Sequence, residues 1–396
     1  MTEPPGSRDW IGYRVARWRD LAGLTQRELA ERIGVSREYI SMIESGKRPV
    51  STRRLLNELC QALGVHVEDL TMQPVAPRNT DEMVLYAMAP HVRRALDGEE
   101  PHSGQPRSLA QLAADADRAM SLRMTAGWEE LAELLPALIV ETVGLDSDEG
   151  RLLFCRALYS AALVCRSTGH LDLARRCADR AVAVAAQVGE PVHVAAVGFA
   201  LAQAALAGGS PKLSLATAER TAERLQTSGA QGDDVVSIAG MLHLGGALAA
   251  ASLGRTDRAS EHLGEAAELA TQAAGDPWRC EFGTANVGAW RVAVACESAD
   301  WGRAPELAAA VDTTQFRTAD RVSRLHVDAA RGWYELGEAP KATRELLIAM
   351  ETSPRGTRVL PCVREVTAQL ARDAGRRGSA ELQRLVSWVG VDPLAE

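Results

Sequence analysis

A turn motif that recurs about every forty residues constrains this chain more than any other feature of its sequence. In the clearest copy a turn at Gly169 is followed by Leu171 and then by Ala174, Ala178 and Ala181. The other copies follow turns at Gly127, Ser210, Gly254, Ala299 and Gly337. The steps between copies, measured at Ala132, Ala174, Leu215, Ala259, Ala304 and Ala342, are 42, 41, 44, 45 and 38 residues. Small residues at helical spacing let two antiparallel helices approach closely, so the motif predicts six helix pairs.

The copies resemble tetratricopeptide repeats, although their steps are longer than the 34 residues of that family and vary. The resemblance implies a stack of helix pairs with a concave face that receives ligands. Six pairs and a closing helix over 381–389 fill the chain beyond residue 108. Only 4% of the residues are aromatic, and β-sheets favour aromatic side chains, so the composition also predicts an all-α fold.

Short helices with clear end signals follow one another over residues 9–70. Thr25 and Glu28 form a capping box, in which the hydroxyl and the carboxylate each accept from an amide at the start of a helix. Gly34 ends that helix, because glycine takes the left-handed conformation without strain. The same signs predict a helix end near Gly23, a start after Ser36, an end at Gly46 and a start at Ser51.

Two helices of eight or nine residues joined by a glycine turn have the geometry of a helix-turn-helix, whose second helix enters the DNA major groove. The segment LTQRELAERIGVSREYISMIESGKRPVSTRRLLNELCQALGV resembles the Cro/C1-type (XRE) DNA-binding domain. The signals that coincide in register are TQ-x-ELA, GVS, the IS-x-IE-x-G-x-RP turn and the fourth helix. The resemblance implies that the chain binds a double-stranded DNA operator.

The resemblance also implies roles for single residues. Gln26 is expected to bind a phosphate, and the residues expected along the DNA backbone are Ser36, Tyr39, Lys47 and Arg48. The base-facing positions are Arg37, Glu38 and Met42. Arg37 can contact guanine with two hydrogen bonds, and Glu38 can accept from a cytosine amine. Arg19 and Glu44 are expected to pair with each other as a structural contact.

The charge distribution agrees with a DNA-binding domain at the N-terminal end of the sequence. Residues 8–54 hold 11 basic and 6 acidic side chains, whereas the whole chain carries a net charge of −8. A basic segment on an acidic chain suits contact with a polyanion, although a solvated surface would show the same asymmetry.

Residues 73–107 have the composition of a linker, with prolines at 74, 77, 101 and 106. Within it, apolar spacing predicts a bridging helix over 81–96, bent at Pro90, which packs either on a partner subunit or on its own chain. We therefore predict a Cro/C1-type helix-turn-helix domain over 8–72, a linker over 73–107 and a tetratricopeptide-like α-solenoid over 108–396.

The repeat register places the first helix of each pair on the concave side. It predicts an effector site formed by Arg156, Tyr159, Arg166, Asn286, Arg324, Arg331 and Glu335. The Asn286 amide can bind a peptide backbone through both its donor and its acceptor, or it can bridge neighbouring helices. Arginines favour a ligand with a carboxylate or another anionic group. Trp301 and Trp333 fall at core positions of the repeat.

A Cro/C1-type head on a tetratricopeptide-like body resembles the peptide- and ligand-sensing regulators of Gram-positive bacteria. The resemblance implies a transcriptional regulator that dimerises through its helical-repeat domain and senses a peptide or an anionic small molecule. The alternative is a constitutive DNA-binding regulator whose solenoid docks a protein partner.

Other classes of function lack support in the sequence. No phosphate-binding glycine loop, HExxH or GxSxG motif is present, so we expect no catalytic residues, metal or cofactor. The cysteines at 60, 155, 165, 177, 280, 296 and 362 have no disulfide or zinc spacing, and we expect buried thiols. The apolar stretch 192–209 predicts two buried helix pieces, and the N-terminus lacks a signal-peptide pattern, so we expect a cytoplasmic chain without membrane contact.

Overall fold

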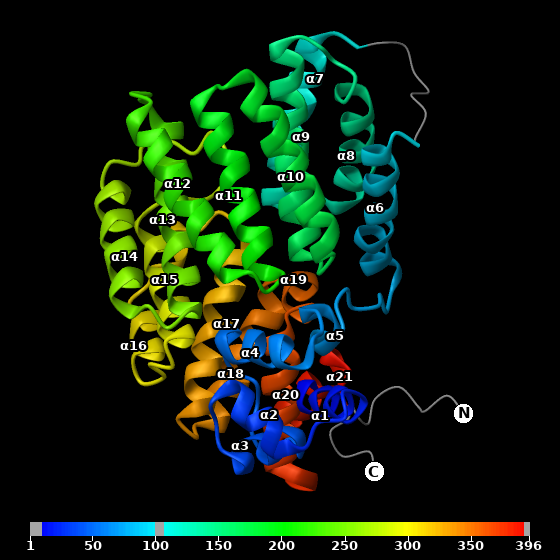
Figure 1. Cartoon of the computed structure of the whole chain (residues 1–396), viewed down its shortest axis with the longest axis vertical. Helices are drawn as coiled ribbons and strands as arrows, with labels where there is room; N and C mark the ends of the chain where they lie inside the picture. The colour runs from blue at the N-terminus through cyan, green and yellow to red at the C-terminus, as the bar shows by residue number, and fades with distance from the viewer. Residues whose placement is uncertain (1–9, 100–106, 392–396) are drawn as a thin grey trace. The chain divides into compact units, whose positions relative to one another are not determined.

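The computed structural model describes residues 10–99 and 107–391, and every regular element in these ranges is a helix. The described residues form two compact units. Those up to Gln73 and those from Gly288 onward form the first unit, and Pro74–Val287 forms the second. The all-α fold is therefore confirmed, with a helix-turn-helix followed by helix pairs (Figure 1). The exact boundaries 8–72, 73–107 and 108–396 stay a prediction.

The head, which we define as described residues 10–73, is drawn in blue in Figure 1. Its helices are α1 (Ile11–Leu21), α2 (Gln26–Ile33), α3 (Arg37–Glu44), α4 (Arg53–Leu63) and α5 (Val67–Thr71). Their apolar faces meet in a core whose fully buried members are Val15, Leu29, Ile40, Ile43, Leu59 and Leu70. This core holds α2 and α3 in one rigid body.

The predicted ends of α2 and the start of α3 are confirmed. The Thr25 hydroxyl accepts from the Glu28 amide at 3.2 Å, and the Glu28 carboxylate accepts from the Thr25 amide at 2.7 Å. Gly34 ends α2 with a φ of 73°. The Ser36 hydroxyl caps α3 by accepting from the Tyr39 amide at 3.1 Å.

The predicted start of α4 at Ser51 is wrong by one residue. Thr52 is the capping residue, and its hydroxyl accepts from the Leu55 amide at 3.2 Å. The Ser51 hydroxyl instead donates to the Glu335 carboxylate, so it is not available to the helix start.

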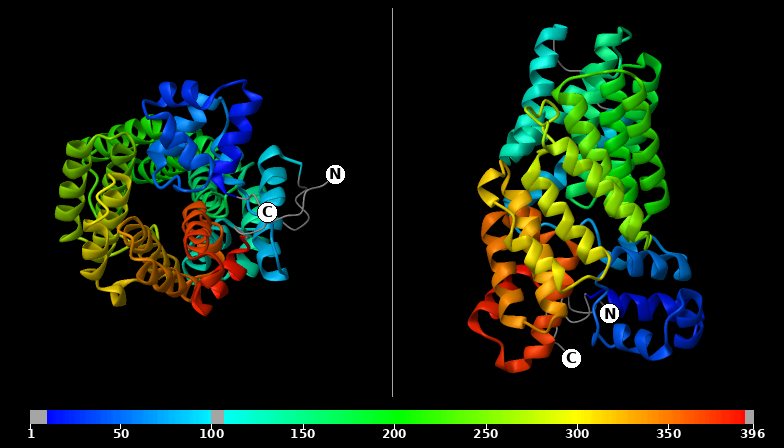
Figure 2. Two further views of the ribbon diagram at one scale, coloured as in Figure 1. Left: turned by 90° about the horizontal axis from the view of Figure 1, so that it is seen from below. Right: turned by 90° about the vertical axis from the view of Figure 1, so that its left-hand side faces the viewer.

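The second unit begins with α6 (Thr80–Asp97), which occupies the place of the predicted bridging helix and contains Pro90. It packs against α8. The further helices are α7 (Leu109–Thr125), α8 (Trp128–Thr142), α9 (Asp148–Ser167), α10 (Leu171–Val188), α11 (Pro191–Ala207), α12 (Pro211–Thr227), α13 (Asp233–Ser252) and α14 (Thr256–Ala270). They form pairs that lie side by side in chain order (Figure 2). Pro101 and Pro106 of the predicted linker lie outside the described residues.

The chain continues with α15 (Thr284–Glu297), which begins in the second unit and ends in the first. It is followed by α16 (Arg303–Ala309), η1 (Thr313–Gln315), α17 (Ala319–Glu335), α18 (Ala339–Thr352), α19 (Pro354–Arg358), α20 (Pro361–Ala374), η2 (Gly375–Arg377) and α21 (Ala380–Val389). The predicted turns at Gly127, Gly169, Ser210, Gly254 and Gly337 each fall between two helices that pack against each other, and the turn at Ala299 falls between α15 and α16. The sequence did not predict α19 and α20, and the closing helix α21 packs on α20 and α18.

Small residues form the contacts between paired helices, as predicted. Ala174, Ala178 and Ala181 on α10 have no exposed surface where this helix packs on α9. Trp301 and Trp333 pack against apolar clusters of the first unit, which confirms their predicted core positions. None of the seven cysteines, all within the described part of the chain, forms a disulfide.

Two helices are strongly apolar. Residues 191–207 form the single helix α11, so the prediction of two helix pieces is wrong. Among the described residues, α13 is the helix long and apolar enough to cross a membrane, and 78% of its most apolar window is buried inside the protein. Such burial is typical of a core helix that packs between neighbours.

Gly12 is a point of close approach between α1 and α3. A Cβ added at Gly12 would lie 1.9 Å from the carbonyl oxygen of Ile43, so the backbones of the two helices touch here. We expect Gly12→Ala to destabilise the protein by about 1–3 kcal/mol, because α1 must move away from α3.

Thermal unfolding followed by circular dichroism measures this effect. The control is Gly264→Ala on α14, where an added Cβ meets nothing within 4 Å. This variant should be neutral or gain roughly 0.5–1 kcal/mol, as glycine to alanine changes in helices do. Equal midpoints for Gly12→Ala and the wild type would contradict the close packing of α1 on α3.

Candidate nucleic-acid interface

The start of α3 projects into solvent. Ser36 fixes this end through its hydrogen bond to the Tyr39 amide. Arg37 and Glu38, in the first turn, are both exposed, while Ile40 and Ile43 on the opposite face are fully buried. A recognition helix reads bases with side chains near its N-terminal end, so the two predicted base-reading residues have the exposure that this role needs.

Further positions on and after α3 extend this surface. Met42 is 38% exposed, an unusual exposure for a large apolar side chain. Lys47 and Arg48 are exposed in the turn that follows the helix. The Arg48 guanidinium lies 5.4 Å from the centre of the Tyr39 ring, which orients it along α3. The contacts of these residues with DNA stay predictions.

Arg19 and Glu44 form the structural pair that the sequence predicted. Arg19 Nε donates to Glu44 Oε1 at 2.6 Å, and Arg19 Nη2 donates to Oε2 at 3.0 Å. This two-point contact joins the end of α1 to the end of α3. Gln26 donates to Glu44 Oε2 at 2.8 Å, so its side chain is oriented by the same carboxylate.

The comparisons with known proteins agree with this geometry. A family model described as helix-turn-helix matches residues 15–70. The uncharacterized HTH-type transcriptional regulator y4dJ of Sinorhizobium fredii is 45% identical over 74 residues, which are 18% of this chain and 95% of that protein. The chain belongs to the HTH-type transcriptional regulators.

Among solved structures, Bacillus thuringiensis PlcR in complex with the peptide PapR7 and DNA is 12% identical to this regulator. That comparison covers 87% of this chain and 95% of the other, with a TM-score of 0.30.

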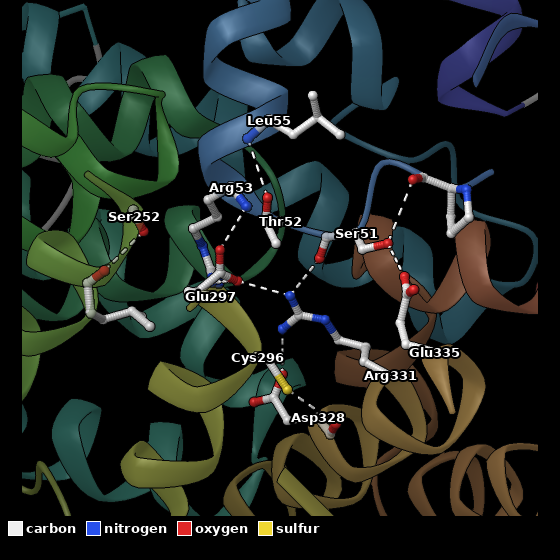
Figure 3. A network of polar contacts seen from close by, with 12 residues as sticks. Ser51, Thr52, Arg53, Leu55, Ser252, Cys296, Glu297, Asp328, Arg331 and Glu335 are labelled. Carbon is white, nitrogen blue, oxygen red and sulfur yellow. Dashed lines mark hydrogen bonds and ion pairs between the residues drawn. The ribbon is translucent and has the colours of Figure 1, made fainter. Parts of the chain in front are cut away.

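A buried carboxylate holds the regulator's head on the C-terminal helices of the first unit (Figure 3). Glu297, the last residue of α15, accepts from the Arg53 backbone amide at 2.6 Å and from Arg53 Nη1 at 2.7 Å. It also accepts from Arg331 Nη2 of α17 at 2.9 Å. The Arg53 amide is the first of α4, one of the donors that have no partner within a helix. Glu297 therefore serves as an anion at the positive end of α4.

The same cluster includes the residues just before α4. Arg331 Nη2 donates to the Ser51 carbonyl at 2.6 Å, and Arg331 Nη1 donates to Asp328 at 2.7 Å. Glu335 accepts from the Ser51 hydroxyl. We call Ser51, Arg53, Glu297, Arg331 and Glu335 the docking cluster.

The electrostatic balance of Glu297 favours its charged form. Its side chain is 1% exposed, and burial alone would raise its pKa. The Arg53 and Arg331 guanidiniums and the Arg53 amide outweigh this effect and hold the pKa below its ordinary value. A carboxyl with a lowered pKa stabilises the folded state above its ordinary pKa, and this contribution is lost as the pH falls through the lowered value.

A second contact holds the other end of the head. Glu365 of α20 accepts from the Ile11 amide, the first of α1, at 2.6 Å. Burial raises the pKa of this carboxyl, and the Ile11 amide opposes the effect. Arg372 donates to the Gly46 carbonyl at 3.1 Å, and its guanidinium lies 4.0 Å from the centre of the Trp10 ring.

The predicted effector residues fall into both units. In the second unit, Arg156 pairs with Asp117, Arg166 is half-buried, Tyr159 is fully buried, and Asn286 Nδ2 contacts Met241 Sδ at 3.6 Å. In the first unit, Arg324 pairs with Asp320 at 3.0 Å, while Arg331 and Glu335 belong to the docking cluster. Their binding to an effector stays a prediction.

Sequence reasoning did not find the docking residues Glu297, Glu365 and Arg372. They lie at helix ends or on helix faces with no motif around them, and their partners are more than 200 residues away in the chain. The described residues hold no group of three or more His, Cys, Asp or Glu placed to bind a metal.

We expect Glu297→Gln to weaken the docking of the head strongly. Removing one partner of a buried ion pair typically costs about 3–5 kcal/mol, because the other charge stays buried without compensation. Hydrogen exchange of the Arg53 amide should become faster by orders of magnitude, and the thermal midpoint should fall.

Glu58→Gln on the same helix is the matched control, since Glu58 forms an exposed pair with Arg54 at 2.9 Å. Such surface pairs contribute about 0–1 kcal/mol, so its midpoint should stay close to that of the wild type. Similar exchange rates in both variants would contradict the role of Glu297.

Proposed function

We propose that this DNA-binding transcriptional regulator is sequence-specific, reads its operator with α3 and adjusts the position of its head in response to an effector. The observation that carries the proposal is the division of the head into two sides. Arg37, Glu38 and Lys47 are exposed on one side, while the docking cluster and Glu365 hold the other. The head is thus fixed to the helical repeats without covering its predicted DNA surface.

In this function the predicted residues have distinct tasks. Arg37, Glu38 and Met42 contact bases, and the residues that contact phosphates or the backbone are Gln26, Ser36, Tyr39, Lys47 and Arg48. Charged side chains that reach phosphates bind all sequences alike, while side chains on base edges discriminate between sequences. No cofactor or catalytic residue takes part, and the regulator acts in the cytoplasm.

The proposal includes a homodimer. A single head of this size reaches few base pairs, and helix-turn-helix proteins gain specificity from two half-sites about 10 base pairs or a multiple apart. Fixing each head on the C-terminal helices of its own first unit limits the orientations that the head can take in a dimer. The docking cluster therefore supports a geometric match between dimer and operator.

The proposal also includes a peptide or anionic small-molecule effector. A ligand can regulate only if it binds the DNA-competent and incompetent shapes with different affinity. Helix α15 supports such coupling, because it begins in the second unit and ends at Glu297 of the docking cluster. Arg331 and Glu335 act in docking in this account, which leaves Arg156, Tyr159, Arg166, Asn286 and Arg324 as effector residues. The alternative is a constitutive regulator whose repeats dock a protein partner, and operator binding that no ligand alters would favour it.

Arg37 and Lys47 test the reading of bases. Arg37→Ala should weaken binding to the cognate operator by about 1–3 kcal/mol and relax the preference at one base pair. Lys47→Ala should weaken binding to all sequences alike and reduce the salt slope by about one phosphate contact. Fluorescence anisotropy on a set of operator variants at several salt concentrations measures both effects. If Arg37→Ala lowers the affinity equally for all operator variants, Arg37 contacts the DNA backbone, and this result would contradict base reading.

Multi-angle light scattering tests the dimer. We expect twice the mass of one chain, both for the protein alone and, after subtracting the duplex, on a DNA with two half-sites. A duplex with one half-site should bind at least about tenfold more weakly, since only one head contacts bases. The mass of a single chain in both states would contradict the dimer.

A further inference from the structure

The segment Gly275–Gly283 between α14 and α15 lies deep in the second unit although it forms no helix. Connecting segments usually run over the surface of a protein. Here four of nine residues are buried, with at most 9% exposure: Trp278, Cys280, Glu281 and Phe282. We call Gly275–Gly283 the inserted segment.

Trp278 is the first anchor of the inserted segment. Its ring packs edge-on against Tyr159 of α9 with 5.1 Å between ring centres, and against His193 of α11 at 4.9 Å. The Tyr159 hydroxyl donates to the Trp278 carbonyl at 3.4 Å. The indole therefore fills a place formed by two different helix pairs, with the aromatic geometry that such contacts favour.

Phe282 is the second anchor. A Cβ added at Gly240 of α13 would lie 1.9 Å from the Phe282 ring, so the ring rests directly on the helix backbone. A residue with a side chain at position 240 would exclude Phe282 from this place. Gly240 thus forms the floor of a second aromatic place.

The backbone of the inserted segment is fixed by one hydrogen bond from a neighbouring helix and by two within the segment. Arg123 of α7 donates to the Arg279 carbonyl at 2.6 Å. The carboxylate of Asp276, a residue of the segment itself, accepts from the amides of Cys280 and Glu281 at 2.9 and 2.7 Å. Arg279 and Glu281 have φ values of 50° and 62°, a conformation that costs energy for residues with a Cβ. Backbone in such a conformation persists only where its surroundings hold it, and it clusters at ligand clamps and switches.

The helices that hold the inserted segment share one position in the repeat. The contacts come from α7, α9, α11 and α13, the first helix of four consecutive pairs. In the sequence-predicted register these first helices line the ligand side of the repeats, and Tyr159 was one of the expected effector residues. This side chain is fully buried, and its ring and hydroxyl contact Trp278 of the inserted segment.

We propose that the inserted segment is an internal occupant of a peptide-binding face, and that an extended peptide with an aromatic side chain competes for the place of Trp278. Arg123 then binds a carbonyl of the incoming peptide, and Gly240 leaves room for a second aromatic side chain. The chemistry of recognition is therefore aromatic anchors combined with hydrogen bonds to a backbone.

Displacement of the inserted segment can act on the head through helix α15, and this step rests on the proposed function. Helix α15 starts at Thr284, directly after the inserted segment, and its last residue is the docking residue Glu297. A change at the start of α15 reaches the carboxylate at its end through one continuous helix. Release of the segment would thus alter how the head is held.

The test uses the full chain and a blocked, fluorescein-labelled peptide with the sequence of residues 275–283, GDPWRCEFG. In the variant Trp278→Ala/Phe282→Ala both aromatic places are vacant, so the peptide should bind at least about tenfold more tightly than to the wild type. A peptide with alanine in place of tryptophan should lose at least about tenfold in affinity. Trp301→Ala is the control, because this core tryptophan lies in another cluster and its loss should create no peptide site.

Hydrogen exchange in the inserted segment provides a second readout on the wild type, which guards against a variant that fails to fold. An excess of unlabelled peptide should speed exchange of the amides of the buried residues Trp278 and Phe282 in the full chain, since displacement exposes them to solvent. Peptide that binds all variants equally, or binds none and leaves exchange unchanged, would overturn the inference. Peptide binding to the vacated variant with unchanged operator affinity would support the inserted segment and contradict the proposed effector response.

Discussion

The first unit depends on the burial of one carboxylate. Glu297 is 1% exposed and joins the start of α4 to the end of α15 and to Arg331 on α17. Buried ion pairs contribute little net stability, because desolvation offsets their attraction, but an unpaired member is strongly unfavourable. The cluster therefore penalises every arrangement of the head that separates Arg53 from Glu297. It determines the orientation of the head more than the stability of the fold.

The second unit follows a different physical rule, the close approach of small residues. Alanines such as Ala174 and Ala178 let paired helices pack with little side-chain volume between them. On the first helices α9 and α11, the rings of Tyr159 and His193 contact Trp278 of the inserted segment. A stack built from small residues leaves room along one face, and in this regulator an irregular segment with two aromatic anchors fills it.

Local signals made much of this structure predictable. Thr25, Glu28 and Gly34 act within one or two helical turns, so their roles follow from spacing alone. The six turns were predictable for the same reason. The Arg53–Glu297 contact spans 244 residues and has no local signal. Arg331 was assigned to an effector from the repeat register, whereas it binds Ser51, because the register says which face a residue takes but not which element covers it.

The contacts of Glu297 and Glu365 with the head imply that the head and the C-terminal helices of the first unit move as one body. Relaxation of backbone ¹⁵N nuclei in the full chain without DNA measures this most directly, because it reports rotational motion residue by residue. We expect the same rotational correlation time for α1–α5 as for α17–α21. A clearly shorter correlation time for α1–α5, typical of an independent small domain, would contradict it.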